Sequence, residues 1–448
     1  MTPASVAHRV EADGSVSKAT CDPTAASPVP PTAKPALARA GESIAFTYDV
    51  TYVESPQAWA TRWDPLLAPT GGAVGGGGGV HWFALVNSAA VALFLAAMVA
   101  LIMARTLRND ISAYNALDAA AGADGDGGDE AGWKLLHGDV FRPPPAPAAL
   151  AVAVGTGAQI GAAGLVTLVA AAAGFLSPAN RGGLGTALAR LFVACGVVGG
   201  HASARTYKAA RGTAWKSTTM ATALAFPAAV GGVGVVLWAV AAARGSTRAA
   251  PPSTVLALFA LWLAVALPLT FAGALAGYRA PTPDPPCRVN RIPRQVPPQP
   301  LYLAPPLTAA LGGLLPFGAV FIELFFAMTS IWQDRFYYLF GFLLLAAAVL
   351  AITSAEIAVV LTYFALASED YRWWWRAFAA PAASGGYVLL YAGYYFFTRM
   401  DTVGVEAALL FFGYNALVAA AFAAVTGAVG FAASHAFVRT IYSAVKID

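Results

Sequence analysis

Residues 337–366 read YYLFGFLLLAAAVLAITSAEIAVVLTYFAL and carry a single charged side chain, that of Glu356. A helix needs about 20 predominantly apolar residues to cross the roughly 30 Å hydrocarbon core of a bilayer. This stretch exceeds that length and holds almost nothing that would be costly to remove from water. It therefore predicts a helix that spans a membrane.

Eight further stretches along the chain have a comparable length and composition. They are 82–104, 148–176, 184–204, 218–243, 254–277, 306–330, 380–398 and 405–438. The whole chain is 58% hydrophobic and 11% charged, with a mean hydropathy of +0.63, which is too apolar for an ordinary soluble protein. The sequence predicts an all-α polytopic membrane protein, a nine-transmembrane-helix bundle whose partner is the lipid bilayer.

The segments outside these spans have their own compositions. Residues 1–43 are rich in Ala, Pro, Ser and Thr and are expected to be disordered. Residues 44–70 begin with a strand-like alternation, too short to be stable alone, and are expected to be the remnant of a lumenal β domain. Residues 71–80 form a Gly-rich linker. The nine-helix domain then covers 81–448, with a long loop at 105–147 and a tail at 439–448.

Lys and Arg residues are distributed unevenly between the loops. The loops and the tail that follow odd-numbered spans carry 16 of them, whereas the loops after even-numbered spans carry 5. Basic loops are retained on the cytosolic side of a membrane. The pattern therefore predicts a lumenal or external amino terminus, a cytosolic loop at 105–147 and a cytosolic tail at 439–448.

Several classes of function are disfavoured. The net charge is only +4 and the basic residues lie in short clusters, which argues against nucleic acid as a partner. The three cysteines are scattered, and no histidine pair has the i, i+4 spacing of a metal site. No nucleophile elbow, Walker loop or kinase string is present. We expect no catalytic residue, no metal and no cofactor.

Two carboxylates lie inside apolar spans, Glu323 in the sixth and Glu356 in the seventh. A charge there costs at least a few kcal/mol unless it is paired, protonated or hydrated. One interpretation is a proton or ion relay in a transport pathway. The other, which we favour, is hydrogen bonding between helices, with Thr329, Thr353, Tyr363 or Arg190 as partners. Arg190 is itself a candidate, because it interrupts the third span.

Prolines and small residues also interrupt the spans. Pro227, Pro268 and Pro316 fall inside spans four, five and six, where proline removes a backbone donor and kinks a helix. The glycines of the second and third spans, at 155, 157, 161, 196, 199 and 200, are expected to allow close helix packing instead of binding phosphate. Residues 373–375, three tryptophans beside two arginines, indicate an aromatic anchor at a membrane boundary.

The loops carry strings that identify a family. They are HWF (81–83), ALIMARTLRND (100–110), GWKLLHGDVFRPP (132–144), GFLSPANRG (174–182), NRIPRQVPPQP (290–300), LPFGAVFIELFFAMTSIW (315–332), SEDYRWWW (368–375) and KID (446–448). With these strings the chain resembles the transmembrane 9 superfamily, or nonaspanins, from about residue 44 to its end. Only residues 44–67 resemble the family's sizeable lumenal domain, most of which is expected to be missing. Arg190 departs from the family, in which an apolar residue is expected.

The resemblance implies a non-enzymatic protein of Golgi and endosomal membranes that sorts or delivers other membrane proteins. Clients with glycine-rich transmembrane helices are among those it implies. The ending with Lys446 and Asp448 is similar to a retention signal that the coat complex coatomer binds on the cytosolic side. The alternative is a secondary transporter or channel for a small solute or ion that uses Glu323 and Glu356.

Overall fold

The computed structural model describes residues 54, 82–124, 132–173, 175–176, 183–243, 245, 251–281, 284–332, 340–400 and 404–444. The expected disordered segment, the β-containing remnant and the Gly-rich linker lie outside these residues, apart from Glu54. Lys446 and Asp448 lie outside them too. Every element described below belongs to the compact unit Asp64–Asp448.

All regular secondary structure in the described ranges is helical. The elements are α2 (Trp82–Asp124), η3 (Gly132–Leu136), α3 (Pro147–Ala172), α4 (Gly183–Ala194), α5 (Gly196–Ala209), α6 (Trp215–Ala243), α7 (Pro252–Leu261), η4 (Trp262–Ala266), α8 (Leu267–Arg279), η5 (Leu301–Leu303), α9 (Pro305–Trp332), α10 (Phe340–Ala367), α11 (Trp374–Arg399) and α12 (Val405–Ala444). The described residues thus confirm the all-α prediction.

Seven of the described helical stretches are long and apolar enough to cross a membrane. They are Ala92–Ala113, Pro147–Ala172, Gly183–Ala209, Trp215–Ala243, Pro252–Arg279, Leu343–Ala367 and Val405–Ala444. The prediction of a multi-pass membrane protein is thus confirmed, whereas the count of nine is not. Within α9 the described apolar stretch, Pro305–Phe321, is shorter. Helix α11 contains serine, glycines and several tyrosines, which lower its hydropathy.

Two predicted boundaries differ from the structure. The first span was expected to end at 104, but α2 continues to Asp124. Met103, Leu107 and Ile111 recur every four residues along this extension and pack against a buried apolar cluster, so that one face of the helix is held. The predicted third span is divided at Cys195, where α4 ends and α5 begins.

Prolines leave most helices continuous. Pro227 lies inside α6 and Pro316 inside α9. Pro268 follows a π-helical turn, Trp262–Ala266, in which the Leu267 N–H bonds to the Trp262 carbonyl five residues back. Proline has no backbone N–H to donate, and the wider turn lets the helix continue past this missing hydrogen bond. The chain therefore passes from α7 to α8 as one helical rod.

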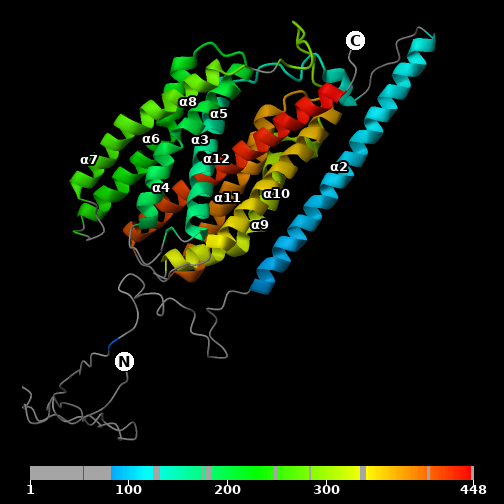
Figure 1. Ribbon diagram of the computed structural model, residues 1–448. Coiled ribbons are helices and arrows are strands. Elements are labelled where there is room, and N and C mark those ends of the chain that lie inside the picture. The colour runs from blue at the N-terminus through cyan, green and yellow to red at the C-terminus, as the bar shows by residue number, and fades with distance from the viewer. Residues whose placement is uncertain are drawn as a thin grey trace, which may run out of the picture. The chain divides into compact units, whose positions relative to one another are not determined.

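The helices form two groups that meet at α3 (Figure 1). In one group α3 packs against α4, α5 and α6, and α5 packs against α8. In the other, α10 and α11 pack against each other and against both α9 and α12. Helix α3 also contacts α10 and α12 and so joins the groups. Helix α2 stands at the edge, where it packs against α10.

Close helix approach depends on glycine, as the sequence predicts. A Cβ atom at Gly200 in α5 would collide with the backbone carbonyl of Thr270 in α8. A Cβ atom at Gly157 in α3 would collide with the carbonyl of Ala424 in α12. Backbone atoms cannot move aside as a flexible side chain can, so these contacts need the missing side chain. The interpretation of these glycines as packing residues is confirmed.

Candidate functional site

The largest group of fully buried side chains lies at one end of the bundle. It includes Trp133, Leu136, Val140 and Trp373, each no more than 1% exposed. We call this end, with residues 132–146, 280–304 and 368–373, the loop end. It contains three of the strings that carry the family resemblance.

The segment that starts with η3 fastens three helices together. The indole Nε1 of Trp133 donates to Oδ2 of Asp110 in α2, at 3.3 Å. The same carboxylate oxygen accepts a hydrogen bond of 2.6 Å from the hydroxyl of Tyr363 in α10. The hydroxyl of Tyr442, near the end of α12, donates to the Trp133 carbonyl. Helix α2 and the ends of α10 and α12 are therefore held around one tryptophan.

A second set of contacts binds the segment between α8 and α9 to the loop end. The backbone N–H of Asn290 donates to the Gly138 carbonyl at 2.7 Å. Arg142 donates to the Asn290 carbonyl at 2.9 Å and to the Asp139 carboxylate at 3.0 Å. A Cβ atom at Gly138 would meet the side chain of Asn290. Glycine thus permits the two segments to approach.

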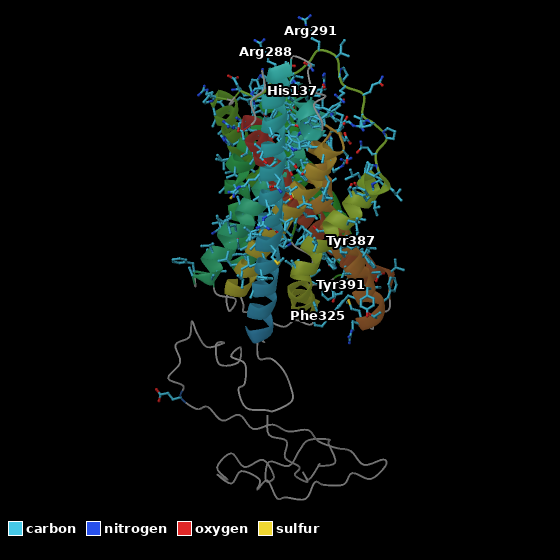
Figure 2. The ribbon with its side chains drawn as sticks, turned by 90° about the vertical axis from the view of Figure 1, so that its right-hand side faces the viewer. His137, Arg288, Arg291, Phe325, Tyr387 and Tyr391 are labelled. Atoms are coloured by element: carbon cyan, nitrogen blue, oxygen red, sulfur yellow. The ribbon has the colours of Figure 1, made fainter. Side chains whose placement is uncertain are left out.

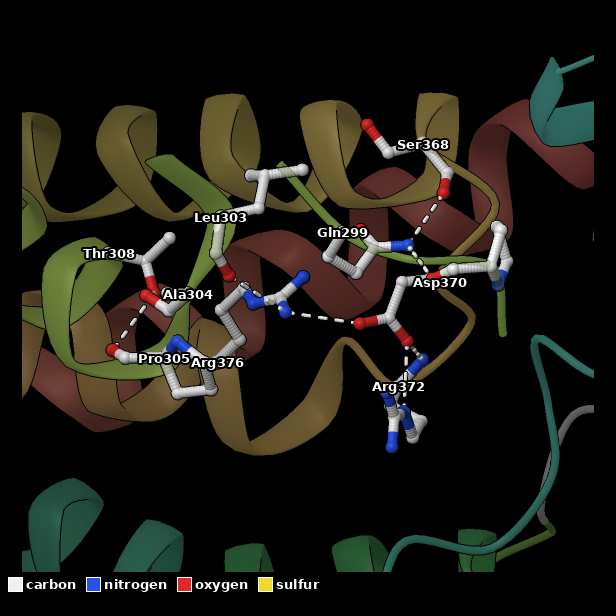
Figure 3. Close-up of polar contacts among 10 residues, drawn as sticks. Gln299, Leu303, Ala304, Pro305, Thr308, Ser368, Asp370, Arg372 and Arg376 are labelled. Atoms are coloured by element: carbon white, nitrogen blue, oxygen red, sulfur yellow. Dashed lines mark hydrogen bonds and ion pairs between the residues drawn. The ribbon is translucent and has the colours of Figure 1, made fainter. Parts of the chain in front are cut away.

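The third set centres on the buried carboxylate of Asp370, whose side chain is 2% exposed (Figure 3). One of its oxygens accepts from the backbone N–H and the Nε of Arg372, each at 3.0 Å. The other accepts from Nη2 of Arg376 at 3.1 Å, and this guanidinium also reaches the Leu303 carbonyl. Two arginines and a backbone donor compensate the cost of burying the charge.

The tryptophans beside Asp370 are not a surface anchor. Trp373 and Trp374 are 1% and 6% exposed, so the predicted membrane-boundary role is wrong for both. The Trp373 indole donates to the Val140 carbonyl at 3.0 Å, and its ring stacks on Phe431 in α12. Trp375 is half-buried and donates to the Pro145 carbonyl. The indole N–H groups find carbonyl acceptors inside the loop end, which allows the rings to be buried.

Cys287 lies in the same apolar cluster and is 5% exposed. Burial raises the pKa of its thiol to about 11, because the thiolate would lose its hydration. The thiol is therefore protonated at neutral pH. Cys287 packs as an apolar side chain and is unsuited to nucleophilic chemistry.

The intramembrane candidates are not brought together by any described contact. Glu356 is half-buried in α10, and no described residue donates a hydrogen bond to it. Two expected partners are engaged elsewhere: Thr353 donates to its own helix, and Tyr363 donates to Asp110. Arg190 is exposed on α4, which packs against α3, α5 and η4. The side chain of Glu323 lies outside the described set.

Two cavities accompany these elements. A small one of about 50 Å³ lies at the loop end, between Arg142, Leu150, Trp373, Phe431 and His435. A larger, almost wholly apolar groove of about 540 Å³ lies between α6 and α12 and is lined by residues such as Gly232 and Phe412. Glu356 lines neither of them. Within the described residues, no group of three or more His, Cys, Asp or Glu could hold a metal ion.

Comparison with known proteins decides the family. The family described as Endomembrane protein 70 matches residues 1–405. Transmembrane 9 superfamily member 10 of Arabidopsis thaliana is 47% identical over 96% of this chain and 66% of its own length. The chain is a member of the transmembrane 9 superfamily. Transmembrane 9 superfamily member 4 of Homo sapiens is 41% identical over 90% of this chain.

The chain spans about two thirds of the length of these transmembrane 9 relatives, 66% of the Arabidopsis protein and 61% of the human one. The resemblance inferred from the loop strings is confirmed. No solved structure matches this transmembrane 9 chain.

The sequence strings marked the loop end of this transmembrane 9 member without showing what its residues do. Asp110, Asp139 and Asp370 lie within or at the edge of the strings, yet none was a candidate. Asp110 is bound by Trp133 and Tyr363 from other segments. Asp139 and Asp370 are bound by arginines that follow them within six residues. A carboxylate followed closely by arginines, as in residues 370–376, was the available signal.

Proposed function

We propose that the chain is a non-enzymatic, nine-span protein of Golgi and endosomal membranes that sorts other membrane proteins. Its amino terminus is lumenal and its carboxyl terminus cytosolic. The observation that carries the proposal is the fixed end of α12, where the Tyr442 hydroxyl bonds to the Trp133 carbonyl. Because Tyr442 is held, the short tail that follows it starts from a fixed position, which lowers the entropy cost when a coat protein binds the tail.

The orientation rests on the charges of the loop end. The basic loops that predict a cytosolic face include 132–142, 280–294 and 372–376, and the structure joins these same segments. An epitope tag after residue 448 is then accessible to protease in intact Golgi vesicles only from the cytosolic side. Protection of the tag until detergent is added would reverse the orientation.

The retention signal is Lys446 with Asp448. Their joint replacement by alanine is expected to move a tagged chain from the Golgi toward the plasma membrane, since coatomer no longer returns it. The matched control is Ser443→Ala, because the Ser443 hydroxyl donates to the Thr440 carbonyl of its own helix. An unchanged Golgi pattern in the Lys446→Ala, Asp448→Ala chain would remove the signal.

Clients are expected to dock on membrane-facing helix surfaces with few side-chain atoms. Helix α6 offers one, since nothing lies within 4 Å of a Cβ position at Gly231 or Gly234. Close helix approach in a membrane favours such positions. A photo-crosslinker at the exposed Val235 of α6 should capture membrane proteins more efficiently than one at the exposed Leu101 of α2. Equal capture of lipid alone at both positions would count against docking there.

The transporter alternative keeps one observation in its favour. Glu356 is half-buried in the apolar helix α10 and receives no hydrogen bond from the described residues. A carboxylate retained at such cost is a common mark of a proton or ion pathway. Glu323, two residues beyond the described apolar stretch Pro305–Phe321 of α9, is the second carboxylate of this alternative.

A further inference from the structure

The segment between α8 and α9 is a fixed extended strap. Residues 284–300 contain no helix or strand, and prolines at 285, 286, 293, 297, 298 and 300 restrict the backbone. Three contacts hold it: Asn290 to the Gly138 carbonyl, Arg294 to Glu369 at 3.0 Å, and Gln299 to the Ser368 carbonyl at 2.9 Å. We call residues 287–294 the arginine strap. Its shape is set before any partner arrives.

Two arginines of the strap differ from the third, Arg294. Arg288 and Arg291 are exposed and make no ion pair with a described residue. Figure 2 shows both at the extremity of the loop end, with their side chains directed away from the helices. Arg294, in contrast, is bound to Glu369, and Arg142 is bound to Asp139. Within the strap, Arg294 holds the segment in place, whereas Arg288 and Arg291 face solvent, where a partner can reach them.

An exposed apolar side chain lies beside them. Ile292 is 83% exposed, although it follows Arg291 directly and precedes Pro293. A basic loop needs only its charges to determine membrane orientation, so orientation explains neither the exposed isoleucine nor the fixed backbone. Arginines around an apolar side chain are the composition of a protein interface.

The strap is held by the same short segment that holds the base of the tail. Gly138 binds Asn290, and Trp133, five residues earlier, binds Tyr442. Lys446 follows Tyr442 by four residues, so the lysine lies within about 14 Å of Tyr442 even if the chain between them is fully extended. One protein could therefore contact both the strap and the tail.

We propose that Arg288, Arg291 and Ile292 form a docking surface for an acidic, partly apolar face of a cytosolic protein. The partner is the coat protein that binds the tail. This inference rests on the proposed function, because that function makes the loop end cytosolic and supplies the coat. The strap adds a rigid contact to a short flexible peptide, and two linked weak contacts give a binding strength that neither supplies alone. Charge attraction also accelerates encounter.

The test measures binding of purified coatomer to the full chain in phosphatidylcholine nanodiscs. Arg288→Glu with Arg291→Glu is expected to raise the dissociation constant about tenfold or more, with a weaker salt dependence than the wild-type chain shows. Ile292→Ser should weaken binding without changing the salt dependence. The matched control, Arg211→Glu with Arg279→Glu, makes the same charge change at two exposed residues outside the strap. Its affinity should stay close to that of the wild type.

Each outcome separates the strap from the tail. If the strap variant binds like the wild type while Lys446→Ala with Asp448→Ala abolishes binding, the strap proposal is wrong and the retention signal stands. Loss of binding in the strap variant alone supports the strap and removes the tail. Equal losses in the strap and control variants would assign the effect to overall charge and overturn the proposal. The proposal is also overturned if the strap variant loses adhesion to phosphatidylserine vesicles but binds coatomer as the wild type does. It is overturned as well if the wild-type chain does not bind coatomer.

Discussion

The hydroxyl of Tyr442 donates to the backbone carbonyl of Trp133 across 309 residues of sequence, at 2.5 Å. Tyr442→Phe removes this donor, keeps the ring that packs edge-on against Trp133, and leaves a buried carbonyl poorly satisfied. We expect a loss of about 1 kcal/mol in the free energy of unfolding. Thermal unfolding of the purified chain measures it. Tyr414→Phe, at an exposed position of the same helix, is the control and should change nothing.

The buried ion pair of Asp370 and Arg376 gives a larger effect. Asp370→Asn leaves the guanidinium of Arg376, only 10% exposed, without its counter-charge. Breaking one side of a buried pair costs roughly 3–5 kcal/mol. Glu369→Gln tests the neighbouring pair with Arg294, which is 40% and 32% exposed, and should cost no more than about 1 kcal/mol. Similar unfolding temperatures for the two variants would show that Asp370 is better solvated than the structure indicates.

The span positions were readable from composition, because each apolar run is local. The stretch 218–243 agrees closely with α6 (Trp215–Ala243), and 337–366 agrees closely with α10 (Phe340–Ala367). The extension of α2 was missed because a charged segment follows the apolar run. Met103, Leu107 and Ile111 nevertheless carried a four-residue spacing that indicates a helix face.

The loop end was not predictable in the same way. Trp373 was interpreted as a membrane anchor from its arginine neighbours, but its acceptor is the Val140 carbonyl, 233 residues away. A single sequence holds no record of such pairs, and a backbone carbonyl carries no side-chain signal at all. The strings showed which segments carry the family resemblance. Only the fold showed that these segments contact one another.

The approach of Gly138 to Asn290 predicts a coupled pair of substitutions. Gly138→Ala alone should destabilise the chain, because its Cβ displaces the Asn290 side chain and disturbs the backbone bond between the two residues. Adding Asn290→Ala makes room for the new methyl group. The double variant should therefore be more stable than the sum of the single effects allows, which a double-mutant cycle on unfolding free energies measures. Strict additivity would show that the two side chains do not compete for space.

The thiol of Cys287 predicts a pH dependence. With Cys21 and Cys195 replaced by serine, maleimide labelling of the folded chain should be slow at neutral pH and should rise until about pH 11, because the thiolate is the reactive form. Since the folded pKa is raised above the ordinary value of 9.0, the contribution of this group to stability is complete below pH 9. It is lost as pH rises toward 11. Labelling of the denatured chain, with its ordinary pKa, is the control. Equal rates in the two states would contradict burial.

Replacement of Glu356 by glutamine separates the two proposed functions. The amide costs less to bury than a carboxylate that receives no hydrogen bond from the described residues, so the sorting proposal predicts unchanged Golgi location and a higher unfolding temperature. The transporter alternative instead predicts loss of a pH-dependent flux in reconstituted vesicles, with folding intact. Thr353→Val, one turn away, removes a hydroxyl bonded within its own helix and controls for disturbance of α10. A fall in stability with no flux in either chain would assign Glu356 to hydrogen bonding between helices, because the amide would then have lost a partner that the carboxylate held.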